Sequence, residues 1–209
     1  MVKMLIMYIY IYMKINILGY ILIVFVFIIA YRILQESEYL NLKCIISQVD
    51  GNRYCVRERS KLTLAVDLLA NITVNMNKLV KYLGEKYPDR ENVKRLVKGY
   101  NPKTITETLP TSEYTAYSEN KGEKIAFCLN TEKKGGSRLI DENTLMFVAL
   151  HELSHVASKS IGHTDEFWNN FKFLIKEAET ISIYNPEDYK KNSKRYCGTN
   201  IVDNPYFDL

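Results

Sequence analysis

Residues 141–168 read DENTLMFVALHELSHVASKSIGHTDEFW and contain all three histidines of the 209-residue chain. His151 and His155 belong to an H-E-x-x-H pattern. Positions i and i+4 of a helix lie on one face, so both imidazoles can reach one metal ion. Glu152 projects from nearly the same face, and His163 follows beyond a glycine that can end the helix. This stretch predicts a zinc site.

The helix that carries the pattern is expected to be buried. Asp141 is a suitable N-cap, and the residues after it are apolar nearly all round, which is typical of a buried helix. Polar side chains on a buried helix cost free energy unless they are satisfied, and a metal ion would satisfy them. We therefore interpret His151 and His155 as ligands rather than as incidental core histidines.

The ligand set favours catalysis. A catalytic zinc takes three protein ligands and keeps one position for water, whereas a structural zinc is closed by four ligands that usually include cysteine. His151, His155 and His163 supply three nitrogens, and we expect one Zn²⁺ per chain. Glu152 is expected to act as the general base that takes a proton from the attacking water. Glu177, in the next helix, is the alternative third ligand.

The segments around this helix predict a small α+β domain with a long helix and a small, mostly antiparallel sheet. Hydrophobic periodicity and turn residues define its elements. In chain order these are a β-hairpin over 43–57, a long helix from Ser60 to about residue 83, a shorter helix over 90–98, strands over 113–117 and 123–130, the histidine helix, a helix over 164–183, and an irregular tail from Tyr184.

The strand before the histidine helix is a candidate for substrate binding. In metallopeptidases built around such a helix, this strand is usually the sheet edge, to which an extended peptide adds by main-chain hydrogen bonds. We therefore predict that substrate binds along four consecutive residues, Lys124, Ile125, Ala126 and Phe127. The alternative is a plain interior strand. Tyr114, Tyr117, Tyr184 and Tyr196 are all candidates to stabilise the oxyanion, and none stands out.

The N-terminus predicts a membrane anchor. Residues 15–34 read INILGYILIVFVFIIAYRIL, about the length needed to cross a bilayer as a helix. The apolar run exceeds the core of a cleaved signal peptide, and no small-x-small cleavage site follows it. We expect residues 1–35 to form a single-pass anchor and residues 36–209 to form a zincin-like domain. Basic residues flank the span on both sides and leave its orientation open.

Charge and cysteine content limit the remaining possibilities. Three of the 28 basic residues and none of the 24 acidic residues lie in the first 34 positions, so 25 basic residues remain against 24 acidic ones. The domain is therefore nearly neutral, and we expect no nucleic-acid partner. The four cysteines are too widely spaced for a C-x-x-C zinc site, and we interpret them as free or buried thiols. Disulfides are the alternative if the domain faces an oxidising compartment.

The residues around the histidines resemble a known family. HELSHVASKSIGHTDEFW resembles the H-E-x-x-H…G-H-x-x-x-F-W signature of the WLM and SprT-like minimal zincins, with Phe167 and Trp168 as the aromatic pair. In that family the three histidines bind zinc and the glutamate is catalytic. The metzincin pattern is not matched, because the third histidine comes two residues too late. DGNRYCVR, NTLMFVALHELSH and YCGTNIVDNP are also similar to predicted membrane-anchored metallopeptidases of large DNA viruses.

The resemblance implies a small α+β zincin with peptidase activity, acting on proteins or peptides at a viral or host endomembrane. Some relatives act on proteins crosslinked to DNA, and a neutral, anchored domain does not favour that role here. Two other hypotheses stay open: an inactive zincin-like membrane protein with a structural zinc that acts in assembly or binding, and a hydrolase of non-peptide amides. The intact Glu152 favours the peptidase, because a structural site has no use for a base.

Overall fold

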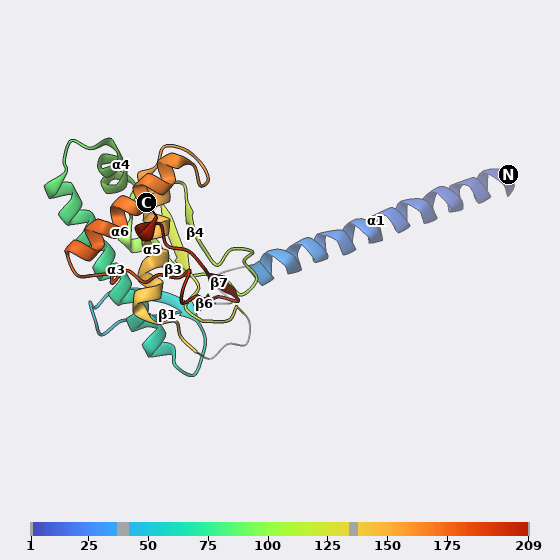
Figure 1. The fold of residues 1–209 in the computed structure, drawn as a ribbon. Coiled ribbons are helices and arrows are strands. Elements are labelled where there is room, and N and C mark those ends of the chain that lie inside the picture. The colour runs from blue at the N-terminus through green and yellow to red at the C-terminus, as the bar shows by residue number, and fades with distance from the viewer. Residues whose placement is uncertain (1, 37–41, 134–137, 209) are drawn as a thin grey trace. The chain divides into compact units, whose positions relative to one another are not determined.

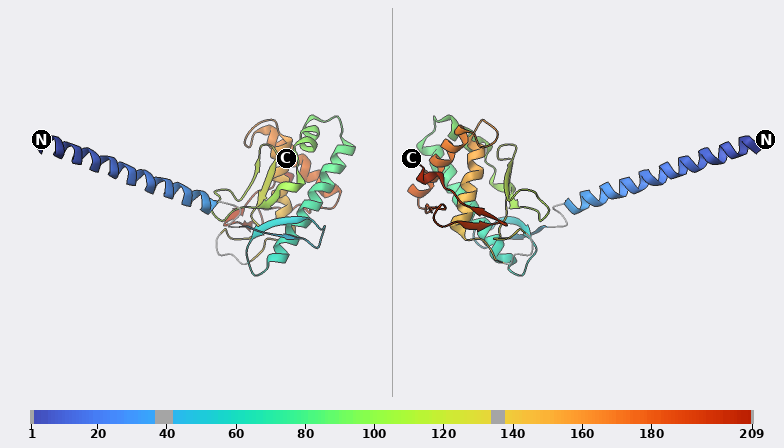
Figure 2. Two further views of the ribbon diagram at one scale, coloured as in Figure 1. Left: turned by 180° about the vertical axis from the view of Figure 1, so that it is seen from behind. Right: turned by 45° about the vertical axis from the view of Figure 1, so that its right-hand side comes forward.

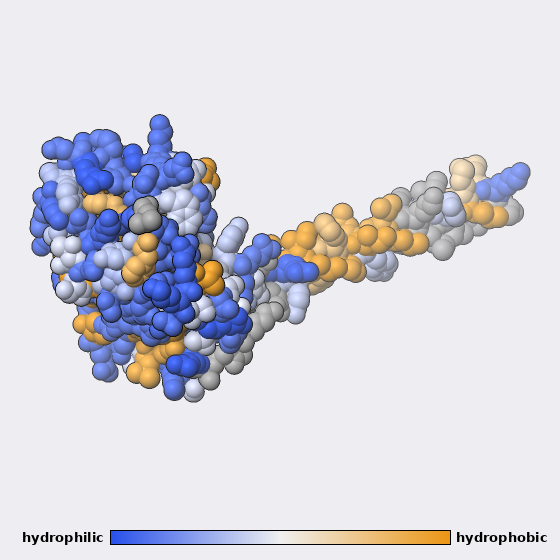
Figure 3. Space-filling model, viewed as in Figure 1, coloured by the Kyte–Doolittle hydropathy of each residue, from blue (hydrophilic) through white to orange (hydrophobic). Residues whose placement is uncertain are grey.

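The computed structural model describes residues 2–36, 42–133 and 138–208, and the chain divides into two compact units, Met1–Asn41 and Leu42–Leu209. The first unit contains one helix, α1, Val2–Glu36. Its segment Ile17–Leu34 has a mean hydropathy of 2.6 and no buried residue. By length and composition this segment can cross a membrane. Figure 3 colours most of the helix hydrophobic, whereas the visible face of the second unit is mostly hydrophilic.

The second unit is an α+β domain, as predicted (Figure 1). Its elements in chain order are β1 (Leu42–Ile46), β2 (Arg53–Arg57), α3 (Leu62–Lys86), α4 (Glu91–Gly99), η1 (Pro102–Thr104), β3 (Ile105–Glu107), β4 (Ala116–Glu119), β5 (Lys124–Phe127), α5 (Glu142–Ala157), α6 (Asp165–Thr180), β6 (Lys194–Tyr196), β7 (Thr199–Ile201) and η2 (Pro205–Phe207). The tail was expected to be irregular, and instead it contains the antiparallel hairpin β6–β7.

The main sheet is mixed, so the prediction of a mostly antiparallel sheet is wrong. Its strand order is β1-β2-β3-β5-β4. The β1–β2 and β4–β5 pairs are antiparallel, while β3 runs parallel to both β2 and β5. Helices α3 and α4 form the crossover from β2 to β3, and a crossover returns the chain in the same direction. Because β3 has only three residues, the sequence pattern did not reveal it.

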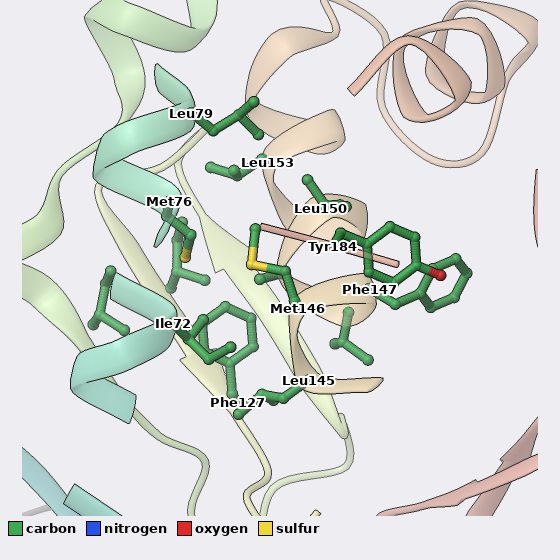
Figure 4. Packing of buried hydrophobic residues seen from close by; sticks show 14 of the residues in the cluster. Ile72, Met76, Leu79, Phe127, Leu145, Met146, Phe147, Leu150, Leu153 and Tyr184 are labelled. Carbon is green, nitrogen blue, oxygen red and sulfur yellow. The ribbon is translucent and has the colours of Figure 1, made fainter. Parts of the chain in front are cut away.

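Helix α5 lies at the centre of the domain. It packs on α3, α4 and α6 and on strands β4 and β5, and Figure 2 shows it between α6 and the sheet. In Figure 4, Met76 and Leu79 of α3 and Met146 and Leu153 of α5 point into the same space, and all four are fully buried. Burying each such side chain contributes about 1.5–3 kcal/mol. Apolar packing therefore fixes where α5 sits.

All four cysteines are paired, so the expectation of free thiols is wrong. Cys44 bonds to Cys55 and Cys128 bonds to Cys197. Cys44 and Cys55 are directly opposed in the β1–β2 register. The Cys197 N–H donates to the Asn130 carbonyl at 3.0 Å, which places Cys197 near Cys128 although the two are 69 residues apart. Sequence spacing could not show either pairing, because each depends on which strands and loops meet.

Candidate metal centre

The ends of α5 are set by local sequence. Asp141 Oδ1 accepts a hydrogen bond from Thr144 N at 2.9 Å, which confirms the predicted N-cap. Ser158 has an extended backbone and stops the helix, and its N–H donates to the Ser154 carbonyl at 3.0 Å. Most side chains between these ends are buried. The helix is therefore buried as predicted, and its polar side chains need partners.

Three imidazoles converge at one point of the domain. His151 and His155 come from α5, one turn apart, and His163 comes from the loop before α6. Their ligand atoms all lie within 4.8 Å of one another. His163 Nε2 lies 3.0 Å from His151 Nε2. His151 and His155 are half-buried, whereas His163 is exposed, so the cluster is open to solvent on one side.

The cluster fits a zinc ion by the chemistry of its donors. The three imidazoles can serve one ion, because their ligand atoms all lie within 4.8 Å of one another. Imidazole nitrogen is a preferred zinc ligand. Three nitrogens with one side open match a ligand set that leaves a coordination position for a water or substrate.

Burial keeps the two helix histidines neutral. The pKa of His151 is lowered to about 3, first by burial and then by the neighbouring His155 and His163. The pKa of His155 is lowered to about 4, by burial, by His163 and by Lys121. Only a neutral imidazole offers a lone pair to a metal, so both side chains are held in the form that binds one.

Phe167 packs against all three imidazole rings of the histidine cluster. Its ring centroid lies 4.8, 4.4 and 4.6 Å from those of His151, His155 and His163. Phe167 is fully buried, while Trp168, the second aromatic of the pair, is partly exposed with its ring centroid 5.8 Å from that of His163. Of the aromatic pair recognised in the sequence, Phe167 packs against all three imidazoles and Trp168 packs against His163.

Glu152 is buried beside the histidines in the chain. Only 4% of its surface is exposed, and burial raises its pKa to about 8. Without a nearby cation such a carboxyl is mostly protonated at neutral pH. A divalent cation held by the histidines would favour the carboxylate, which is the form that can accept a proton.

The alternative ligand Glu177 is engaged elsewhere. Its carboxylate accepts hydrogen bonds from Lys86 Nζ at 2.9 Å and from the Tyr87 hydroxyl at 2.8 Å, and it is not part of the histidine cluster. Glu166, in the first turn of α6, accepts from two backbone N–H groups of the preceding loop, those of Lys159 and Ser160. Neither carboxylate competes with His163.

The predicted substrate edge lies on the wrong strand. Residues 124–127 form β5, which pairs with β3 on one side and β4 on the other, and three of its four side chains are buried. Both sides of its backbone are used, so a peptide cannot add to it. The interior-strand alternative is confirmed. The two edge strands of the main sheet are β1 and β4, and β4, Ala116–Glu119, is the edge strand next to β5.

Two of the four candidate tyrosines are committed to structural contacts. The Tyr184 hydroxyl accepts from Asn204 Nδ2 at 3.0 Å, and the Tyr196 hydroxyl donates to the Thr115 carbonyl at 3.2 Å.

Sequence reasoning missed Lys121, whose ammonium group contacts the carboxyl end of α5. No sequence signal marked it, because its partners lie more than 30 residues away.

An α+β domain whose buried central helix presents two histidines to a third in the next loop defines a zincin-like domain. The family model described as WLM domain matches residues 80–206. The chain belongs to the WLM family of zinc metalloproteases. The resemblance seen in the sequence is thereby confirmed.

Relatives of the chain occur in large DNA viruses. It is 32% identical over 197 residues to uncharacterized protein R325 of Acanthamoeba polyphaga mimivirus, which covers 92% of this chain and 96% of that protein. It is 42% identical over 82 residues to uncharacterized protein 042R of Invertebrate iridescent virus 3, covering 39% and 48% of the two chains. Among solved structures, Wss1 from Saccharomyces cerevisiae has a TM-score of 0.44 at 19% identity, covering 59% of this chain and 84% of that one.

Removing each candidate third ligand tests the cluster. We expect His163→Ala to lose zinc during dialysis against a chelator that leaves zinc in the parent. Only two of the three imidazole ligands remain in this variant, so it holds the ion more weakly. Glu177→Ala is the matched control and should keep about one zinc per chain. The measurement is metal content of the full chain in detergent. Zinc loss from Glu177→Ala with retention in His163→Ala would assign the third ligand to the glutamate.

Proposed function

We propose that this protein is a membrane-anchored zinc metallopeptidase that hydrolyses peptide bonds. The convergence of His151, His155 and His163, together with the buried Glu152 that follows His151 in α5, carries the proposal. Zinc bound by the three imidazoles would supply a Lewis acid and lower the pKa of water into the neutral range. Membership of the WLM family supports the same reaction.

Glu152 is the residue that moves the proton. Its carboxylate would accept a proton from the attacking water and return it to the leaving amine as the peptide bond breaks. Burial makes the ionised form less stable than in water, and so makes the carboxylate a stronger base. The glutamate side chain follows His151 directly in α5, so the same packed helix positions both the metal ligands and the base.

The donor set favours a catalytic site over a closed structural one. His163 is exposed, and the four cysteines are all used in disulfides. A structural zinc needs a fourth protein ligand, usually cysteine. A structural zinc would also have no use for the buried carboxylate of Glu152 as a base. Both observations favour the peptidase over an inactive assembly protein.

We place the substrate backbone along the free edge of β4. The Cys128 N–H donates to the Thr115 carbonyl, so Thr115 faces β5. Successive residues of a strand point their backbone groups to alternate sides, and Ala116 and Ser118 therefore direct their N–H and C=O groups away from β5. These groups are available to an added peptide strand. Helix α5 packs on β4, which brings this edge close to the histidine helix.

The disulfides support one of the two membrane orientations that the flanking charges leave open. Disulfides persist in oxidising compartments and are rare where thiols are kept reduced. The Cys128–Cys197 bond is buried and joins β5 to the tail, so it belongs to the folded domain. We place residues 42–209 on the oxidising side of a membrane that α1 spans once.

Replacing the base is the direct test of the reaction. We expect Glu152→Gln to keep about one zinc per chain but to cleave an unfolded protein substrate at least about 100-fold more slowly, because general-base catalysis contributes about 10²–10⁴-fold. Zinc content and cleavage rate are measured on the full chain in detergent. Equal rates in parent and variant would refute the mechanism, and zinc retention without cleavage in the parent would favour the structural-site alternative.

A proline in β4 tests the substrate edge. Ser118→Pro removes one outward N–H without removing a hydrogen bond to β5, so we expect kcat/KM for peptides to fall about 3- to 10-fold, the value of one hydrogen bond. Ser118→Ala, which keeps the N–H, should match the parent. Unchanged zinc content and thermal unfolding temperature would show that the fold is intact. An unchanged kcat/KM in Ser118→Pro would place the substrate elsewhere.

Membrane orientation is tested on sealed vesicles. Sealed vesicles are prepared from expressing cells so that the cytoplasmic face of the membrane is outward. The domain should then lie inside the vesicle, and we expect it to resist added protease until detergent is added. When the protein is denatured and treated with a maleimide, its four cysteines should react only if a reductant has been added first. Digestion of the domain in intact vesicles together with four reactive thiols would place it on the reducing side.

A further inference from the structure

The third histidine sits in an exposed loop. Residues 158–163 join α5 to α6, and Ile161 in this loop is 90% exposed. Gly162 adopts a positive φ of 81°, and His163 beside it is also exposed. Fixing the backbone of a free loop costs conformational entropy at every residue. Contacts from outside the loop must therefore hold His163 near the two helix histidines before a metal can bind tightly.

Lys121 supplies such contacts from another part of the fold. Its ammonium group donates to the carbonyl oxygens of Ser160 at 2.6 Å, Ser158 at 2.9 Å and His155 at 3.3 Å. These three bonds use all three donors of the group. The carbonyls at the end of α5 lack helical partners and carry partial negative charge, so a cation is favoured there. One side chain thus joins the last turn of the histidine helix to the loop.

The turn that carries Lys121 is held in place. Asn120 and Lys121 have φ values of 46° and 59°, and Gly122 has a φ of 104°. A Cβ atom at Gly122 would lie 2.6 Å from the carbonyl oxygen of Gly99, so only glycine allows this turn to approach the end of α4. The turn joins β4 to β5. Lys121 therefore projects from a well-packed point next to the free sheet edge.

A second set of charges holds the same loop from the side of α4 and α6. Glu166 accepts from Lys159 N at 3.0 Å and from Ser160 N at 2.9 Å. Arg95 donates to Glu166 at 3.0 Å and to the carbonyl of Ala157 at 2.8 Å. Ser160 is therefore fixed at both its N–H and its C=O, three residues before His163.

We propose that Lys121 is a positioning residue for the metal centre, which fixes the 158–163 loop so that His163 completes the ligand set. The inference rests on the proposed zinc function. Lys121 acts through His163 and touches neither metal nor substrate. Without the ammonium group, the loop backbone has to be ordered when the metal binds, and this cost lowers the affinity. Outer-shell residues that orient ligands contribute about 10–100-fold to metal affinity.

A double-mutant cycle on the full chain in detergent tests the proposal. Zinc affinity is measured by competition with chelators of graded strength for the parent, Lys121→Met, His163→Ala and the double variant. We expect Lys121→Met to bind zinc about 10–100-fold more weakly than the parent, chiefly through faster zinc release. In the His163→Ala background the same change should have little effect, because the residue it positions is gone.

Lys98→Met is the matched control, since Lys98 is an exposed lysine beside Gly99 and should leave zinc affinity unchanged. Thermal unfolding of the metal-free proteins shows whether each variant folds. Equal zinc affinity in parent and Lys121→Met would overturn the proposal while leaving the zinc site intact. An equal loss in both backgrounds would show a general structural role and also overturn it. A parent that binds no zinc would instead refute the proposed function.

Discussion

The domain depends on one conflict within α5. The apolar side chains of this helix drive it into the centre of the fold, where Met146 and Leu153 pack against α3. The same helix carries His151, Glu152 and His155, whose burial costs free energy when they lack partners. In the structure, His163 adds a third imidazole, Phe167 packs against all three rings, and the cluster is open to solvent on the side of His163. A divalent cation held by the three imidazoles would offset this cost for the histidines.

The elements around α5 serve the site in different ways. Phe167, at the start of α6, packs against all three imidazole rings and restricts how they turn. Lys121 in the β4–β5 turn and Arg95 in α4 both donate hydrogen bonds to backbone carbonyls at the end of α5. The histidine loop is thus bonded to the β4–β5 turn and to α6, and these hydrogen bonds limit the freedom of an exposed loop.

The sheet and the disulfides give the site its setting. In the strand order β1-β2-β3-β5-β4, β5 is an interior strand, and β4 is the edge strand beside it, next to the turn that carries Lys121. The Cys128–Cys197 disulfide ties the C-terminal tail to the end of β5. Helix α5 packs on β4, so the edge of the sheet and the helix that carries the histidines belong to one packed framework.

Sequence alone determined the features that depend on local spacing. The i and i+4 histidines, the Asp141 cap and the apolar periodicity of α3 and α5 each require only neighbours along one helix. The apolar N-terminal run is equally local. Tertiary structure decided what depends on distant segments meeting: the mixed sheet, the free edge at β4 instead of β5, and both disulfides. It also brought Lys121 to the histidine helix and engaged Glu177 with Lys86. Chain crossover and packing set these contacts, and no pattern within a single segment records them.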